Sequence, residues 1–96
     1  MSLSGKQVRF LRGLGHHLKP VVMIGKEELT DAVVAAADEA LEKHELIKVK
    51  LQEGCLADRR DIAAQLARLT GAGVAQILGR VILLYRQSSE RIISLP

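Results

Sequence analysis

The sequence predicts one α/β domain, with a four-stranded mixed sheet and three helices in the order helix, strand, helix, strand, helix, strand, strand. The chain has 96 residues, a common size for one domain, and 48% of them are hydrophobic, which is enough for one packed core. Segments with helical spacing of apolar residues alternate with short apolar segments, as expected of strands joined by helical crossovers. Only two residues separate the last two strands, which favours an antiparallel hairpin.

The first helix is expected from about Gly5 to Leu14. Ser4 and Gln7 have the spacing of a capping box, and Gly13 and Gly15 close the helix. At about 100° per residue, the apolar and the basic residues fall on opposite sides of this helix. The apolar side comprises Val8, Phe10, Leu11 and Leu14, and the basic side comprises Lys6, Arg9 and Arg12.

Pro20 prevents the first helix from resuming and favours an extended chain. The next four residues, 21–24, are all apolar, which predicts an interior strand buried on both faces. Gly25 ends this strand.

Thr30 is the expected N-cap of a second helix that runs to about His44. Its apolar stripe comprises Leu29, Val33, Ala36, Ala37, Ala40 and Leu41.

Residues 46–51 alternate between apolar and basic side chains, which predicts a half-buried strand with Lys48 and Lys50 on its outer face. Asp58 is the expected cap of a third helix, which ends at Gly71. Its stripe comprises Ile62, Ala63, Leu66 and Leu69. Strands over 74–78 and 81–85 follow, joined by Gly79-Arg80 as a tight turn.

The charges are distributed unevenly. The net charge is only +3, yet the first 26 residues contain five cations and no acid, and Glu27 is the first carboxylate. Such a local field favours a polyanionic partner. The five cations are Lys6, Arg9, Arg12, Lys19 and Lys26. Phe10 and Tyr85 are the only aromatic residues, which excludes a base-stacking platform built from several aromatic rings.

The composition also excludes several other classes. A single cysteine, Cys55, rules out an internal disulfide and a multi-cysteine zinc site, and suits a reducing compartment. No apolar run reaches the roughly 18 residues of a membrane span, and no apolar stretch typical of a secretory signal follows the first basic residues. We therefore expect a cytoplasmic protein that binds no membrane, metal or cofactor.

The sequence does not indicate an enzyme. The serines lack the glycine-rich setting of a nucleophile elbow, and the three histidines lack a metal-binding spacing. Cys55 is expected to be a structural thiol rather than a nucleophile. His16 and His17 either contact phosphate or occupy a solvated turn, whereas His44 and Glu45 are expected at a polar helix end.

Three further positions are candidates for phosphate contact. The Gly25-Lys26 turn joins a strand directly to a helix start, where backbone N–H groups favour phosphate, but an ordinary loop would have the same pattern. Arg80 and Arg86 lie at opposite ends of the last strand. Each either binds phosphate bidentately or is a solvated arginine at a strand end.

Eight separate segments of the chain carry a family resemblance: residues 3–7, 11–14, 18–22, 24–26, 29–30, 44–50, 79–86 and 93–96. With these segments in this order, the chain resembles the CRM domain family and specifically its single-domain, bacterial YhbY-like members. The resemblance implies a fold similar to the C-terminal domain of bacterial translation initiation factor three. It also implies RNA binding without catalysis, and a role as an assembly factor of the large ribosomal subunit.

The family's RNA-binding loop is a GxxG turn, which by resemblance maps onto Gly25-Lys26-Glu27-Glu28. Here Glu28 replaces the second glycine, so we expect the basic first helix, Lys19 and the final arginines to contribute more to binding.

We expect the chain to form one domain over residues 1–96 and to be a monomer. Its expected partner is ribosomal RNA in pre-large-subunit particles. The expected RNA-binding residues are Lys6, Arg9, Arg12, Lys19, Gly25, Lys26, Arg80 and Arg86. The alternative is an adaptor that recruits a ribosomal protein or an assembly GTPase through its basic face. The apolar tail at Ile92-Ile93 packs either on its own domain or on a neighbour.

Overall fold

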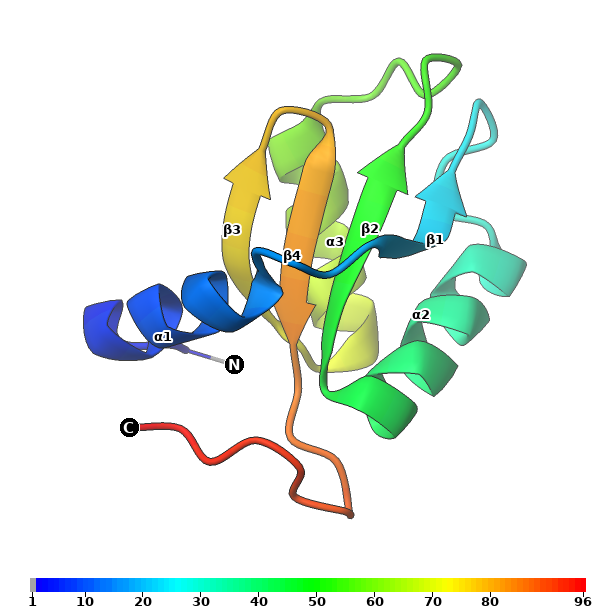
Figure 1. Cartoon of the computed structure of the whole chain (residues 1–96). Coiled ribbons are helices and arrows are strands. Elements are labelled where there is room, and N and C mark those ends of the chain that lie inside the picture. The colour runs from blue at the N-terminus through cyan, green and yellow to red at the C-terminus, as the bar shows by residue number, and fades with distance from the viewer. Residues whose placement is uncertain (1) are drawn as a thin grey trace.

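The computed structural model describes residues 2–96, and Met1 of the expected domain lies outside the described residues. Within those residues, three helices and four strands follow the predicted order, which confirms the predicted fold class (Figure 1). Their bounds are α1 Gly5–Gly15, β1 Pro20–Ile24, α2 Asp31–His44, β2 Leu46–Leu51, α3 Arg59–Thr70, β3 Gly73–Leu78 and β4 Val81–Tyr85.

The four strands form one mixed sheet in the order β1-β2-β4-β3. β1 is parallel to β2, whereas β4 is antiparallel to both β2 and β3. The carboxyl ends of β1 and β2 and the β3–β4 hairpin therefore lie at the same end of the sheet, the upper end in Figure 1. Three loops meet at that end: the turn after β1, the loop between β2 and α3, and the hairpin.

The two faces of the sheet are covered to different extents. Helices α2 and α3 pack on one face over the larger core, to which Ile24, Leu41, Val49, Leu66 and Ile82 contribute. Helix α1 crosses only part of the other face, where Leu11 packs in a smaller cluster with residues of β2, β3 and β4 (Figure 1). The rest of that second face has no helix over it within the described residues.

The prediction that β1 is an interior strand is wrong. β1 lies at the edge of the sheet, and its burial alternates, with Val22 and Ile24 buried while Val21 is 54% and Met23 46% exposed. The exposed pair lies on the face that α1 leaves open. A continuous run of apolar residues is thus compatible with two kinds of strand: one buried on both faces, and one that exposes apolar side chains on one face.

The helix ends are as predicted, with small differences. Ser4 and Gln7 form the capping box, Thr30 caps α2, Asp58 caps α3, and Gly71 ends α3 in the left-handed conformation at φ 71°. Helix α1 continues through Gly13 to Gly15. Each helix packs on the sheet through a narrower apolar stripe than predicted. Four residues of the predicted stripes are therefore exposed: Phe10, Leu14, Ala36 and Leu69.

Glu45 is fully buried, although it was predicted at a polar helix end. Its carboxylate accepts hydrogen bonds from the Ser88 amide and hydroxyl and from the amides of Ile92 and Ile93, at 2.7–2.9 Å. Burial opposes ionisation of Glu45, but these hydrogen bonds together outweigh it and lower its pKa from the ordinary value of 4.5. The carboxylate thus anchors the C-terminal tail on its own domain, and Ile93 packs against the smaller core.

Candidate nucleic-acid interface

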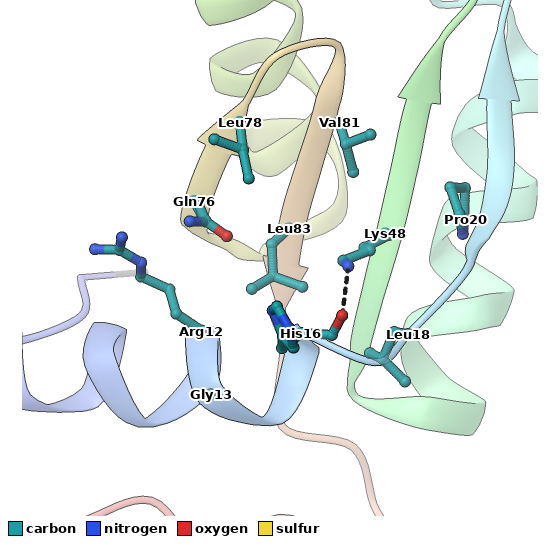
Figure 2. Close-up of a pocket in the computed structure, with 10 residues that line it drawn as sticks. All are labelled: Arg12, Gly13, His16, Leu18, Pro20, Lys48, Gln76, Leu78, Val81 and Leu83. Atoms are coloured by element: carbon teal, nitrogen blue, oxygen red, sulfur yellow. Dashed lines mark hydrogen bonds between the residues drawn. The ribbon is translucent and has the colours of Figure 1, made fainter.

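A groove of about 460 Å³ lies between the end of α1 and the open part of the sheet (Figure 2). α1 and the segment that follows it form one wall, and outward-facing residues of β2, β3 and β4 form the floor. The lining residues are Arg12, Gly13, His16, Leu18, Pro20, Lys48, Gln76, Leu78, Val81 and Leu83. The groove therefore combines an apolar floor with cationic and hydrogen-bonding side chains.

Arg12 and Lys48 lie on opposite sides of Leu83 in this groove (Figure 2). Among residues 2–96, the only salt bridges join Arg86 to Asp38 and Glu42, so no described carboxylate lies within 4.0 Å of the Arg12 guanidinium or the Lys48 ammonium. Lys48 Nζ donates to the His16 carbonyl at 3.5 Å, which ties the end of α1 to β2. Both cations remain available to an anionic ligand.

The Gly25–Glu28 segment forms a tight turn at the upper end of the sheet, in which the Glu28 amide donates to the Gly25 carbonyl at 3.0 Å. Glu28 adopts a φ of 59°, a conformation that favours glycine. At the position of the second glycine in the expected GxxG turn, the chain thus has a backbone conformation that glycine adopts without strain. Lys26, in the middle of the turn, is exposed.

The neighbouring loop between β2 and α3 supports this turn. A Cβ atom built on Gly54 would lie 3.4 Å from the Lys26 Cβ, and the Gln52 amide donates to the Ile24 carbonyl at 2.8 Å. The two loops therefore pack side by side. A Cβ atom at position 54 would therefore be in van der Waals contact with Lys26.

Arg80 is bonded within the chain. Its guanidinium donates to the carbonyls of Leu51, Gln52 and Cys55 at 3.0, 2.7 and 2.9 Å. These bonds hold the loop between β2 and α3 against the β3–β4 hairpin. Three backbone acceptors for one planar guanidinium indicate a positioning function for Arg80.

Arg86 lies near the opposite end of the sheet and is also bonded within the chain. Its guanidinium pairs with the carboxylate of Asp38, donates to the carbonyls of Thr70 and Asp38 at 2.8 and 3.0 Å, and lies 3.6 Å from a Glu42 carboxylate oxygen. It therefore joins β4 to α2 and to the end of α3. Only 18% of its side chain is exposed.

The structure places the other sequence-predicted cations at the surface. Lys6, Arg9 and Arg12 are exposed on α1, and Lys19 is exposed just before β1. Of the expected RNA-binding residues, only Arg12 lines the groove on the sheet, together with His16, which the sequence had left open as a phosphate contact. Sequence reasoning left Lys48 and Gln76 out of the site, although the alternating pattern of residues 46–51 had already indicated a basic outer face.

Among residues 2–96, no group of three or more His, Cys, Asp or Glu side chains could hold a metal ion. No helix in that range has both the length and the apolar character needed to cross a membrane. Cys55 is buried in the larger core, at 1% exposed.

Comparison with known proteins assigns the chain to a family. Residues 3–86 match the family model described as the CRS1/YhbY (CRM) domain. The chain belongs to this family. The CRM domain therefore spans all three helices and all four strands described here, and the family resemblance seen in the sequence is confirmed.

Three relatives match this CRM domain over more than 90% of their own lengths. An "RNA-binding protein" of Haemophilus influenzae is 45% identical over 95 residues, covering 99% of this chain and 96% of that protein. The "Probable RNA-binding protein YqeI" of Bacillus subtilis is 41% identical over 88 residues, covering 92% of each chain. The solution structure of SAV1595 from Staphylococcus aureus has a TM-score of 0.86 and 36% identity, covering 99% of this chain and 100% of that one. The first two of these relatives are named as RNA-binding proteins, the second as a probable one.

Proposed function

We propose that this chain is a non-catalytic RNA-binding protein that forms one CRM domain and binds RNA mainly through phosphate contacts. The names of relatives that cover nearly the whole chain support RNA binding. The observation that carries the proposal is that the cations of α1 and of the sheet face beside it point outward, with no described carboxylate within 4.0 Å. Unpaired cations on one face are what a phosphate backbone requires.

The proposed contact surface begins on α1 and continues across the open sheet face to the Gly25–Glu28 turn. Its cations are Lys6, Arg9, Arg12, Lys19, Lys26, Lys48 and Lys50. Gly25 keeps the turn after β1 free of a bulky side chain, so that a nucleic-acid backbone has room to approach. Arg80 contributes to this surface indirectly, by holding the loop that packs against Lys26.

We further propose that the RNA is ribosomal RNA of a maturing large subunit in the cytoplasm, and that the protein is a monomer. The resemblance to bacterial YhbY-like members supports the ribosomal assignment. The scarcity of aromatic residues supports recognition of RNA shape more than of base sequence. In this proposal the protein acts as an assembly factor.

Sucrose-gradient sedimentation of cell extract at low and high salt tests the ribosomal assignment. Migration with large-subunit particles at low salt, followed by release at high salt, is the expected result, because phosphate contacts weaken as salt competes. A position at the top of the gradient under both conditions would contradict the assignment to the ribosome. Purified protein titrated with RNA then tests RNA binding separately.

An alternative function is a protein adaptor, which an apolar groove of about 370 Å³ favours. Leu14, Leu18, Val21 and Ile92 line this groove, and each is between 38% and 54% exposed. Exposed apolar side chains gathered in one groove are typical of protein contact sites. Association with ribosomal particles or proteins that survives ribonuclease treatment would favour the adaptor over the RNA-binding protein.

A further inference from the structure

One glycine in the groove between α1 and the sheet is not required by the fold. Gly13 lies inside α1, where glycine destabilises a helix relative to alanine. A Cβ atom built on Gly13 would meet no heavy atom within 4 Å. Gly15 differs, because its Cβ atom would lie 2.8 Å from Leu83 Cδ1. Packing within the chain therefore accounts for Gly15 but not for Gly13.

The open space beside Gly13 belongs to the groove, whose floor is apolar. Leu78 is 68% exposed and Val81 is partly exposed, both on the sheet face that α1 leaves uncovered. Leu83 lies between them and α1 (Figure 2). A flat apolar ligand could therefore pack on this part of the sheet. The helix backbone at position 13 would lie beside it, with no side chain in the way.

The polar lining of the same groove is cationic. The Arg12 guanidinium and the Lys48 ammonium flank the floor, and neither has a described carboxylate within 4.0 Å (Figure 2). The His16 imidazole offers a ring for stacking, and the Gln76 amide offers both a donor and an acceptor. No Asp or Glu is among the lining residues. A flat ring with polar edges, attached to an anionic phosphate, matches this combination.

We propose that the groove binds one unpaired nucleotide of RNA, with its base over Leu78 and Val81 and its phosphate between Arg12 and Lys48. The backbone of Gly13 borders the sugar and base, which explains a glycine inside a helix. The volume of about 460 Å³ lies in the usual range of small-molecule sites. This inference rests on the proposed function and goes beyond it, because phosphate contacts alone would accept fully paired RNA equally well.

Two RNA hairpins test the inference by fluorescence anisotropy: one with a single bulged adenosine and one that is fully paired. The wild-type protein should bind the bulged hairpin more tightly. Gly13→Leu fills the groove with a side chain that suits a helix, and should weaken binding of the bulged hairpin about tenfold. It should leave binding of the paired hairpin nearly unchanged. Ala36→Leu, at an exposed position of α2 on the other face of the sheet, is the matched control and should change neither.

Two results would overturn the inference: equal wild-type affinity for both hairpins, or a preference for the bulge that persists in Gly13→Leu. Either result would favour a protein, not a nucleotide, as the ligand of the groove. Wild-type protein that bound neither hairpin would overturn the proposed function as well, so the two failures are distinguishable. Amide spectra of ¹⁵N-labelled wild-type protein need no variant. The signals of Val81 and Leu83 should shift with the bulged hairpin only, and equal shifts with both hairpins would refute the site.

Discussion

Leu51 and Arg80 are hydrogen-bonded to each other in both directions: the Leu51 amide donates to the Arg80 carbonyl at 2.8 Å, and Arg80 Nε donates to the Leu51 carbonyl at 3.0 Å. The same guanidinium binds the Gln52 carbonyl, and the Gln52 amide donates to the Ile24 carbonyl. A continuous set of bonds thus runs from the β3–β4 hairpin to the residue before the Gly25–Glu28 turn. The hairpin and the turn are expected to respond together to changes at position 80.

Arg80→Lys tests this coupling while keeping the charge. Lysine has no planar guanidinium, so it cannot donate hydrogen bonds to all three carbonyls at once. The free energy of unfolding should therefore fall by about 2 kcal/mol. RNA affinity should fall several-fold because the loop beside Lys26 loses its support. Urea unfolding and anisotropy measure the two effects. Arg60→Lys, at an exposed position of α3, is the control; equal stability of the two variants would contradict the coupling.

Glu28→Gly tests the turn that corresponds to GxxG. A glycine relieves the left-handed strain at φ 59°, which should raise the free energy of unfolding by about 1 kcal/mol. It also removes a carboxylate beside Lys26, so RNA affinity should rise. Glu28→Gln separates the two effects, because it removes the charge and keeps the strain. If only the glycine variant binds more tightly, backbone approach limits binding; if neither variant does, this turn does not contact RNA.

Local signals in the sequence predicted the helices and strands well, because each depends on neighbours a few residues apart. Ser4, Thr30 and Asp58 cap helices through bonds to residues two or three positions along the chain. The place of β1 at the edge of the sheet was not predictable in this way. Strand order depends on pairing between distant segments, and an apolar run looks the same in either position.

The candidate site was predictable only in part, for the same reason. The basic side of α1 followed from helical spacing, and the basic side of β2 from alternation. Their meeting across one groove depends on where α1 packs, which no local pattern indicates. Arg86 and Glu45 show the converse case. Arg86 is bonded to Asp38, 48 residues away, and Glu45 to Ser88, 43 residues away, so no local pattern indicates that either side chain is bonded within the fold.

Glu45 makes the stability of the C-terminal tail dependent on pH. The pKa of Glu45 is lowered in the folded state, so its contribution to stability is present above the unfolded value, near 4.5, and is lost as the pH falls through the folded-state pKa. Acid should therefore release the tail first. The amide signals of Ser88, Ile92 and Ile93 should change together in an NMR titration as the pH falls below 4.5. Signals that stay fixed until global unfolding would show that the carboxylate does not control the tail.

Glu45→Gln should reproduce this release at neutral pH. One oxygen of the wild-type carboxylate accepts three hydrogen bonds and the other accepts one, whereas an amide presents a donor in place of one acceptor. The free energy of unfolding should fall by about 2–3 kcal/mol, and the pH dependence below 4.5 should shrink. Glu42→Gln is the matched control, because Glu42 also accepts from a serine amide and hydroxyl, those of Ser89, but is 51% exposed. Its loss should be smaller.

Salt dependence measures how many cations contact phosphate. If five of the exposed cations each neutralise one phosphate, the log–log slope of affinity against salt should be on the order of −4 to −5. The double variant Arg9→Glu, Arg12→Glu removes two of them, so the slope should become shallower by about 2 and affinity should fall steeply. Both side chains are exposed, so circular dichroism should show the helix content retained.

The double variant Arg60→Glu, Arg68→Glu changes the net charge of the protein by the same amount, at two exposed positions of α3 on the opposite face of the sheet. Long-range attraction to RNA depends on net charge and should weaken equally in both variants, because the distant field does not distinguish the faces. Direct phosphate contacts depend on position, so only the α1 variant should lose slope. Equal slopes for the two variants would place the phosphate contacts elsewhere than on α1, and a flat salt response of the wild-type protein would refute phosphate-mediated binding altogether.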